Sequence, residues 1–381
     1  MSDQELPSVD RFKEYFAELP DPRSPINRRH LLIDVIVMCV CGVLSGADGP
    51  AAIAAWAKLH RDWLQEYLEL PHGLPSRDTF RRVLQRLKPQ AFQHCFGAWL
   101  ESLVGPSGAK FLAIDGKTLR RSHDGKHKLG ALHMVSVWAT EQRLTLGQIA
   151  TAAKSNEITA IPLVLDLVDV KGAIVTIDAM GCQTEIAQEI VSREGDYVLP
   201  VKGNQGKLEK AVEAFFDDHL EEDFARVKVS QFKTEERCHG RLEHRCYLQV
   251  DVPKSLPGRE KWAGLKTLGM VIRTREIGGK ETGEVQCYIS SLTRNVKQFA
   301  RAVRGHWGIE NTCHWSLDMT FREDESRARE RNVAENLSWL RRFALGLLKQ
   351  HPDEKTSLVM KRRQCGWSTD FLAEVLFGVK V

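Results

Sequence analysis

The stretch Phe111–Ser122, with the sequence FLAIDGKTLRRS, constrains the fold of this chain most tightly. Its apolar first residues predict a short buried strand that runs into Asp115, and Gly116 is expected to break that strand. The basic residues that follow are Lys117, Arg120 and Arg121. The end of a strand holds a functional acid in a fixed position, and basic side chains beside that acid suit an anionic substrate. A structural strand followed by a charged turn fits the same residues, so this stretch alone does not distinguish a functional site from an ordinary strand end.

A second apolar strand, AIVTI at 173–177, also ends on an acid, Asp178. Neighbouring strand ends of a compact α/β sheet can bring Asp115 and Asp178 together, and two close carboxylates repel each other unless a cation lies between them. Mg²⁺ prefers such oxygen ligands and leaves positions open for phosphate. A third acid on a helix would complete a site for two ions about 4 Å apart, which can hold the attacking and leaving oxygens of a phosphoryl transfer.

Glu310 is the favoured third acid because the apolar residues around it indicate a packed helix that can fix its side chain. Those anchors are Trp307, Ile309 and Leu317, and Trp315 is also expected in the core. His306, Glu310 and His314 are spaced by four and so share one helical face, which puts both imidazoles close to the scissile phosphate. A downstream acidic group is an alternative source of the third ligand, although its stretch FREDESR is expected to be exposed. Its members are Asp318, Glu323 and Asp324.

The order of the predicted elements divides the chain into parts. Residues 1–105 are predicted to be helical, with a linker at 105–110. Residues 106–381 begin with the order β-β-β-α-β-α-β, which indicates an α/β layer with a mixed sheet, and Pro162 is expected in the first turn of its first helix. Alternating segments then indicate a β-rich insertion at about 205–297. A helix through HWGIENTCHWSLD and further amphipathic helices complete the chain.

A basic helix near residue 80 is the main sign of nucleic-acid binding in the N-terminal part. Ser76 can cap this helix, whose apolar face holds Phe80, Val83, Leu84 and Leu87. Its basic side chains are Arg77, Arg81, Arg82, Arg86 and Lys88. A helix-turn-helix that reads DNA and a solvated basic face on a core helix both fit this pattern.

Composition and charge exclude several classes of protein. The 54 basic and 50 acidic side chains give a net charge of only +4, so any DNA affinity has to come from local patches. Nine cysteines without a CxxC pair indicate free thiols in a reducing cytoplasm rather than a zinc ribbon or a disulfide framework. His133, His306 and His314 do not have zinc-ligand spacing either. The apolar run Leu31–Ala47 carries Asp34 and two glycines, which favours a buried helix over a membrane span.

Six segments, taken together and in order, resemble bacterial insertion-sequence transposases of the DDE type, in the ISAs-type group that includes the H-repeat-associated proteins. The segments are FLAIDGKTLRRS, KSNEI, VTIDAMGCQ, DYVLPVKGNQ, HGRLEHR and RGHWGIENTCHWSLDMTFREDESR. The resemblance covers nearly the whole chain. It implies a ribonuclease H-like catalytic domain over 106–381 with a β-rich insertion, and an associated helical N-terminal domain over 1–105 that is expected to bind DNA. It also implies that Asp115, Asp178 and Glu310 form a catalytic triad that binds two Mg²⁺ ions, with Mn²⁺ as a substitute.

The chain departs from many of these relatives around the last acid. They carry Tyr, Arg and Lys at fixed spacing from it, where this chain has Val303, His306 and Leu317. This difference puts in doubt any hairpin-forming route that depends on the Tyr and the Lys. The DNA contacts expected around the catalytic site are Lys117, Arg120, Arg121, Lys202, Asn204, Arg241, Arg304, His306 and Asn311, in addition to Arg77, Arg81 and Arg82. A simple turn fits Lys202 and Asn204 equally well, and a solvated hairpin fits Arg241.

The leading hypothesis for function is a transposase that cuts the ends of an insertion sequence with water and joins the resulting 3′ hydroxyls to target DNA. Two alternatives remain open: a transposase-derived DNA-binding protein that has lost transposition, and a nuclease without strand transfer. All three acids are present, which favours the enzyme. The expected partners are double-stranded DNA and a second copy of the chain on that DNA. The expected location is the bacterial cytoplasm, at the nucleoid when DNA is bound, with no membrane partner.

Overall fold

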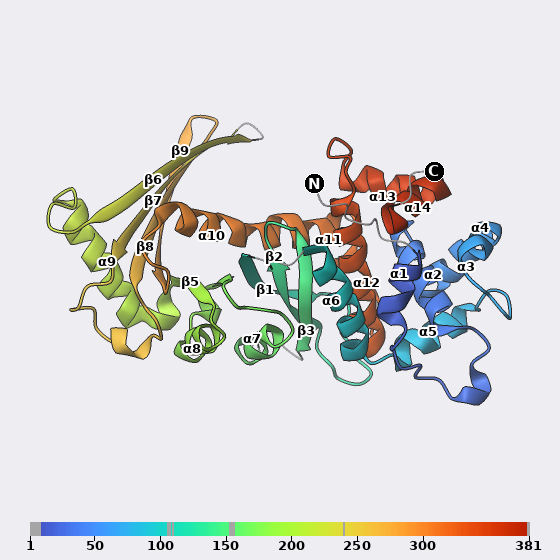
Figure 1. Ribbon diagram of the computed structural model, residues 1–381. Helices are drawn as coiled ribbons and strands as arrows, with labels where there is room; N and C mark the ends of the chain where they lie inside the picture. The colour runs from blue at the N-terminus through green and yellow to red at the C-terminus, as the bar shows by residue number, and fades with distance from the viewer. Residues whose placement is uncertain (1–8, 105–107, 109, 152–156, 239–240, 379–381) are drawn as a thin grey trace.

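The computed structural model describes residues 9–104, 108, 110–151, 157–238 and 241–378. Figure 1 shows three regions in a row: N-terminal helices at one end, a central sheet flanked by helices, and a long twisted β-ribbon at the other end. A helical rod runs along the central sheet and connects the ribbon to the C-terminal helices. The rod consists of α10 (Val296–Gly308), a π-helical segment (Ile309–His314) and α11 (Trp315–Met319).

The N-terminal region is helical, as the sequence predicts. Its helices are α1 (Val9–Phe16), α2 (Leu32–Leu44), α3 (Pro50–Leu59), α4 (Arg61–Tyr67), α5 (Arg77–Arg86) and α6 (Pro89–Val104). The hydroxyl of Ser76 accepts the N–H of Thr79 at 3.3 Å, which confirms the expected cap of α5. α2 is buried from Asp34 to Leu44. Within the described residues, no helix is both long enough and apolar enough to cross a bilayer.

In the described part of the chain, nine strands form one mixed sheet in the order β3-β2-β1-β4-β5-β9-β8-β7-β6. They are β1 (Phe111–Leu119), β2 (Leu132–Ala139), β3 (Leu144–Thr151), β4 (Ile174–Ile177), β5 (Asp196–Val201), β6 (Val229–Cys238), β7 (Arg241–Asp251), β8 (Thr267–Ile277) and β9 (Lys280–Ser290). β1, β4 and β5 are parallel, whereas β2 and β3 pair antiparallel at one edge, which confirms the predicted mixed sheet. The strands β6–β9 join through antiparallel pairing of β9 with β5, so the ribbon continues the central sheet.

Gly116 does not break the first strand, contrary to the expectation from sequence. β1 continues to Leu119 because β2 pairs with it along its whole length. A Cβ at position 116 would lie 2.3 Å from His133 Nε2 and 2.5 Å from Glu157 Oε1. The glycine therefore marks a close approach of side chains to the strand backbone, which is a common reason for glycine within a strand.

Helices cover both faces of the central sheet. α7 (Glu157–Leu165) and α8 (Thr184–Ser192) lie on the face opposite α10, and α9 (Gly206–Leu220) packs against β5 and β9. The C-terminal helices are α12 (Arg331–Gln350), α13 (Leu358–Trp367) and α14 (Thr369–Phe377). Two predictions about other positions are wrong. Pro162 lies in the middle of α7 rather than in its first turn. Trp307 and Trp315, on the helical rod, are 37% and 58% exposed rather than in the core.

The acidic stretch FREDESR is not exposed as a whole, because Glu323 is fully buried in an ion pair with Arg342 of α12. Glu323 Oε1 accepts hydrogen bonds from Arg342 Nη1 and from the hydroxyl of Ser338, both at 3.1 Å. Phe321 is buried beside them. This pair fixes the segment after α11 to the buried helix α12.

Replacing Glu323 by alanine is expected to lower the free energy of unfolding by about 3–5 kcal/mol, because the Arg342 guanidinium would stay buried without its partner. Urea denaturation followed by circular dichroism measures this change. Glu325→Ala is the matched control, since Glu325 lies in the same turn but pairs with Arg322 at the surface, and it should leave the unfolding midpoint nearly unchanged. Equal losses for the two variants would contradict the assigned role of the buried pair.

Candidate active site

Asp115 and Asp178 lie side by side because β1 and β4 are parallel neighbours. Ile114 pairs with Ile177 at the end of β4, so the next residue of each strand is one of the two acids. Asp115 Oδ1 accepts the N–H of Gly116 at 2.8 Å, and Asp178 Oδ1 accepts the N–H of Gly181 at 3.0 Å. Both carboxylates are partly buried. The expectation that adjacent strands bring these two acids together is therefore met by the fold.

A third acid, Glu157, joins this pair, and the sequence analysis did not propose it. The ligand oxygens of Asp115, Glu157 and Asp178 all lie within 4.8 Å of one another. Glu157 is the first residue of α7 and is only 3% exposed. Its Oε2 lies 3.4 Å from Nε2 of the equally buried His133. The signal that could have indicated it is the KSNEI segment, in which an acid stands near the start of a predicted helix.

Glu310 lies on the helical rod, on the face of the sheet opposite α7 (Figure 1), and is not part of the three-acid cluster. It lies in the π-helical segment between α10 and α11 and is exposed. A hollow between the central sheet, α10 and the β-ribbon is lined by Glu310, Asp178, His306 and Lys202. The negative charge of Glu310 also acts on Asp115, whose pKa it helps to raise. The chain thus surrounds the Asp115–Asp178 pair with one carboxylate from each face.

The electrostatics of the cluster are dominated by burial and by like charge. The pKa of Asp115 is raised to about 7 by burial, the largest cause, together with the carboxylates of Glu310, Asp178 and Glu157, while the Gly116 N–H acts in the opposite direction. Burial also holds the pKa of His314 well below its usual range and lowers the pKa of His306 to about 4. Both imidazoles are therefore neutral at pH 7, and neither neutralises the acids.

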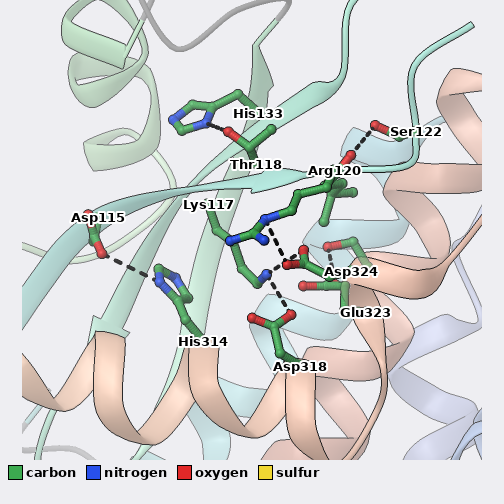
Figure 2. A network of polar contacts seen from close by, with 12 residues as sticks. Asp115, Lys117, Thr118, Arg120, Ser122, His133, His314, Asp318, Glu323 and Asp324 are labelled. Carbon is green, nitrogen blue, oxygen red and sulfur yellow. Dashed lines mark hydrogen bonds and ion pairs between the residues drawn. The ribbon is translucent and has the colours of Figure 1, made fainter.

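The two histidines nevertheless lie where the sequence placed them, against the acidic centre. His314 Nδ1 lies 3.4 Å from Asp115 Oδ2, and His306 Nδ1 lies 3.2 Å from the hydroxyl of Thr176 on β4. Figure 2 shows His314 pointing from the helical rod toward Asp115 on β1. As a neutral ring, each can offer a hydrogen bond but no charge to a bound phosphate.

These residues fit a hard divalent cation. Glu157 Oε2 is buried without a hydrogen-bond partner, and Gly116 leaves open the space beside it that a Cβ would fill. The three clustered carboxylates offer only oxygen ligands, the type that Mg²⁺ and Mn²⁺ prefer. Asp115, Asp178 and Glu157, with Glu310 facing them, could therefore hold such ions.

The downstream acids have partners within the protein. Figure 2 shows Lys117 pointing from β1 toward α11, where its Nζ lies 2.7 Å from Asp318 Oδ1 and 3.0 Å from Asp324 Oδ1. Arg120 Nε lies 3.0 Å from the second oxygen of Asp324. These acids are already paired with cations and lie outside the cluster around Asp115. Lys117 is only 8% exposed and is bound to them, so we do not propose it as a DNA contact.

The other expected DNA contacts lie at different places in the structure. Lys202 and Arg304 line the hollow beside Glu310, and Asn311 is exposed next to it. Asn204 instead donates to the carbonyl of Ala179 at 2.6 Å, which fixes the loop after Asp178. The remaining residues are exposed at other places: Arg121 follows β1, and Arg241 begins β7 on the ribbon.

The arginines of α5 lie in the N-terminal region, away from Asp115 and Asp178 (Figure 1). Arg77, Arg81 and Arg82 are exposed, and Arg81 lies 3.6 Å from Asp78. Arg81 also lines a second hollow, formed with the segment between α11 and α12. The arginines that line this hollow are Arg81, Arg322, Arg327, Arg329 and Arg341, and its acids are Asp48, Glu325 and Glu330. We call it the arginine hollow.

Comparison with known proteins places these observations in a family. A family model described as "Transposase DDE domain" matches residues 106–347, and one described as "DDE_Tnp_1-associated" matches residues 13–100. The chain is 39% identical to "Putative transposase YncI" of Escherichia coli O157:H7 over 373 residues, covering 97% of this chain and 95% of that protein. It is 38% identical to "H repeat-associated putative transposase YhhI" of Escherichia coli strain K12 over 375 residues, covering 97% and 98%.

A shorter relative, "Inactive transposase YbfQ" of Escherichia coli strain K12, is 32% identical over 80 residues, which cover 21% of this chain and 95% of that protein. The matches to the domain model and to the full-length relatives confirm the resemblance that the motifs indicated. The mixed sheet and its helices are the ribonuclease H-like fold of this domain. On these grounds the chain belongs to the family of DDE transposases that includes H repeat-associated proteins.

Proposed function

We propose that this protein is an active transposase that cuts the ends of an insertion sequence and joins them to target DNA by metal-dependent phosphoryl transfer. The observation that carries the proposal is the carboxylate cluster of Asp115, Asp178 and Glu157 at the end of two parallel strands, with the charge of Glu310 on the helical rod acting on Asp115. Such a cluster beside a hollow lined by basic side chains suits a phosphodiester substrate.

In this proposal Asp115, Asp178 and Glu310 hold two Mg²⁺ ions, and Mn²⁺ can substitute. When bound, the ions supply positive charge to the attacking and leaving oxygens. Asp115 has to be ionised to serve as a ligand, so binding of the cation displaces its proton at pH values below about 7. His306 and His314 are neutral, so neither forms an ion pair with the carboxylates. The negative charge of the acids therefore remains free to bind the metal ions.

The reaction proceeds in two steps of the same type. Water attacks the phosphodiester at the end of the element, which breaks the P–O3′ bond and releases a 3′ hydroxyl. That hydroxyl then attacks a phosphodiester of the target and releases the target's own 3′ oxygen. Lys202 and Arg304 are exposed cations that line the hollow beside the acids, and Arg304 also pairs with Glu236 at the surface of the ribbon. Their proposed role is to hold the DNA strand against the charged centre.

No hairpin intermediate is part of the proposal. The positions at which many relatives carry Tyr and Lys hold Val303 and Leu317, and both side chains are buried in the core. They can neither contact a phosphate nor donate a proton, so any direct strand transfer here relies on the released 3′ hydroxyl alone.

DNA binding outside the catalytic centre is assigned to the arginine hollow and the adjoining face of α5. Arg327 and Arg329 are exposed there, next to Arg81. A groove rich in guanidinium groups suits the phosphates of a duplex, because arginine binds phosphate oxygens in a bidentate manner. Two element ends have to be joined in one event, so the proposal includes a homodimer on DNA.

Asp115→Asn, Asp178→Asn and Glu310→Gln are each expected to abolish Mg²⁺-dependent cleavage, because each removes a ligand charge while keeping the side-chain shape. The assay uses duplexes copied from the DNA that flanks the gene, with DNA binding measured in parallel in Ca²⁺. Glu222→Gln is the control, since Glu222 is an exposed acid that belongs neither to the cluster nor to the arginine hollow. Near-normal cleavage by one of the three variants would remove that residue from the triad.

Arg327→Ala combined with Arg329→Ala is expected to weaken duplex binding by the full chain and to make it less sensitive to salt. Each lost phosphate contact should lower the slope of log affinity against log salt by about one. Fluorescence anisotropy over a range of NaCl concentrations measures the slope. Lys254→Ala with Lys261→Ala removes two exposed cations far from the hollow and serves as the control. Unchanged slopes for both double variants would show that the arginine hollow does not bind DNA.

The free energy of unfolding in EDTA is expected to fall as pH rises, because the buried carboxyl of Asp115 loses its proton. The pKa of this carboxyl is 3.8 in the unfolded reference and about 7 in the fold, so the folded state binds the proton more tightly. The resulting penalty is absent below about pH 4 and complete above about pH 7, with an upper limit of about 4 kcal/mol. Asp115→Asn should therefore gain stability over wild type between pH 4.5 and pH 8 in urea titrations. Parallel curves for the two proteins would contradict this assignment.

A further inference from the structure

We propose that Glu157 is a further metal ligand, which binds the cation held by Asp115 and Asp178 from the α7 side of the sheet. The inference rests on the proposed function and deepens it by adding a fourth carboxylate to the expected triad. It concerns which side chains hold the ion and leaves the role of Glu310 on the opposite side unchanged.

The first ground is distance combined with burial. The ligand oxygens of Glu157, Asp115 and Asp178 lie within 4.8 Å of one another, close enough for one ion to contact all three after small side-chain rotations. Glu157 is 3% exposed, and its Oε2 is buried without a hydrogen-bond partner. A buried carboxylate oxygen without a partner is costly, because it loses its hydration and gains nothing in return.

The second ground is the backbone that makes room for this carboxylate. Gly116 follows Asp115, and successive residues of a strand face opposite sides of the sheet. Its missing side chain therefore lies on the α7 side, where a Cβ would lie 2.5 Å from Glu157 Oε1 and 2.8 Å from its Cδ. Any side chain at 116 would push Glu157 away from Asp115. The strand thus keeps a space into which the carboxylate fits.

The competing explanation is that Glu157 only pairs with His133. The two side chains are 3.4 Å apart, but His133 Nε2 is also buried without a hydrogen bond, so the contact does not satisfy either atom. His133 is held from its other side, where Nδ1 lies 2.9 Å from the hydroxyl of Thr118. Figure 2 shows this pair on the side of β1 that faces away from the helical rod. A cation between Glu157 and the aspartates would neutralise the acid that this contact leaves unsatisfied.

The test compares Mn²⁺ binding by the full chain and two variants, measured by electron paramagnetic resonance and calorimetry without DNA. Glu157→Gln should weaken Mn²⁺ affinity roughly tenfold or more, because a ligand charge is lost. Glu335→Gln is the control: Glu335 is also buried, and no other charged group contributes to the shift of its pKa. It should bind Mn²⁺ as wild type does. Equal affinities of wild type and Glu157→Gln would overturn the inference.

Melting temperatures separate a ligand from a purely structural residue by sign. As a ligand, Glu157 repels the aspartates when no cation is present, so Glu157→Gln should melt at a higher temperature in EDTA and gain less from added Mn²⁺. As a structural partner of His133, the same variant should melt at a lower temperature in EDTA and gain as much from Mn²⁺ as wild type, which would overturn the inference.

Asp115→Asn distinguishes failure of this inference from failure of the proposed function. If Asp115→Asn loses Mn²⁺ affinity and Glu157→Gln does not, only the role of Glu157 is wrong. If wild type and Asp115→Asn bind Mn²⁺ equally, the cluster is not a metal site, and both the inference and the proposed function fail.

Discussion

The parallel pairing of β1 with β4 is the constraint on which the rest of the structure depends. It ends at Ile114 and Ile177, so it forces Asp115 and Asp178 to be neighbours. Burial, with the added repulsion of the Glu310 and Asp178 carboxylates, raises the pKa of Asp115 and weakens the fold in the absence of a cation. Only strong packing elsewhere can hold two such groups together, and the flanking strands and helices provide it.

The acids on and around β1 differ in the partners that they contact. Asp318 and Asp324 pair with Lys117, and Glu323 pairs with Arg342, so these carboxylates stabilise the contact of the helical rod and α12 with β1. On the side that faces the helical rod, Asp115 contacts the neutral ring of His314. Alternation along β1 places Asp115 and Lys117 on the same face, two residues apart, which explains how one strand serves a charged centre and an internal ion-pair network together (Figure 2).

Much of this arrangement could be predicted from the sequence, because its signals are local. Apolar runs that end on Asp115 and Asp178 indicated both strands, and the spacing of His306, Glu310 and His314 indicated a helix that faces them. The course of β1 beyond Gly116 could not be predicted, because glycine usually ends a strand and the reason for this one lies in His133 and Glu157, which are distant in sequence. The burial of Glu323 was missed for the same reason: its partner, Arg342, lies on another helix.

The π-helical segment at 309–314 shows why α-helical spacing alone does not explain how His306 and His314 face the sheet together. In a regular α-helix of 3.6 residues per turn, two residues eight apart differ by about 80° around the axis. His306 and His314 nevertheless both reach the sheet, at Thr176 and at Asp115. The wider turns of a π-helix rotate the later residue back toward the same face, and such segments are frequent at functional sites. The widened turn therefore lets one rod bring two imidazoles onto the sheet while the carboxylate between them, Glu310, lines the hollow in which DNA is proposed to bind.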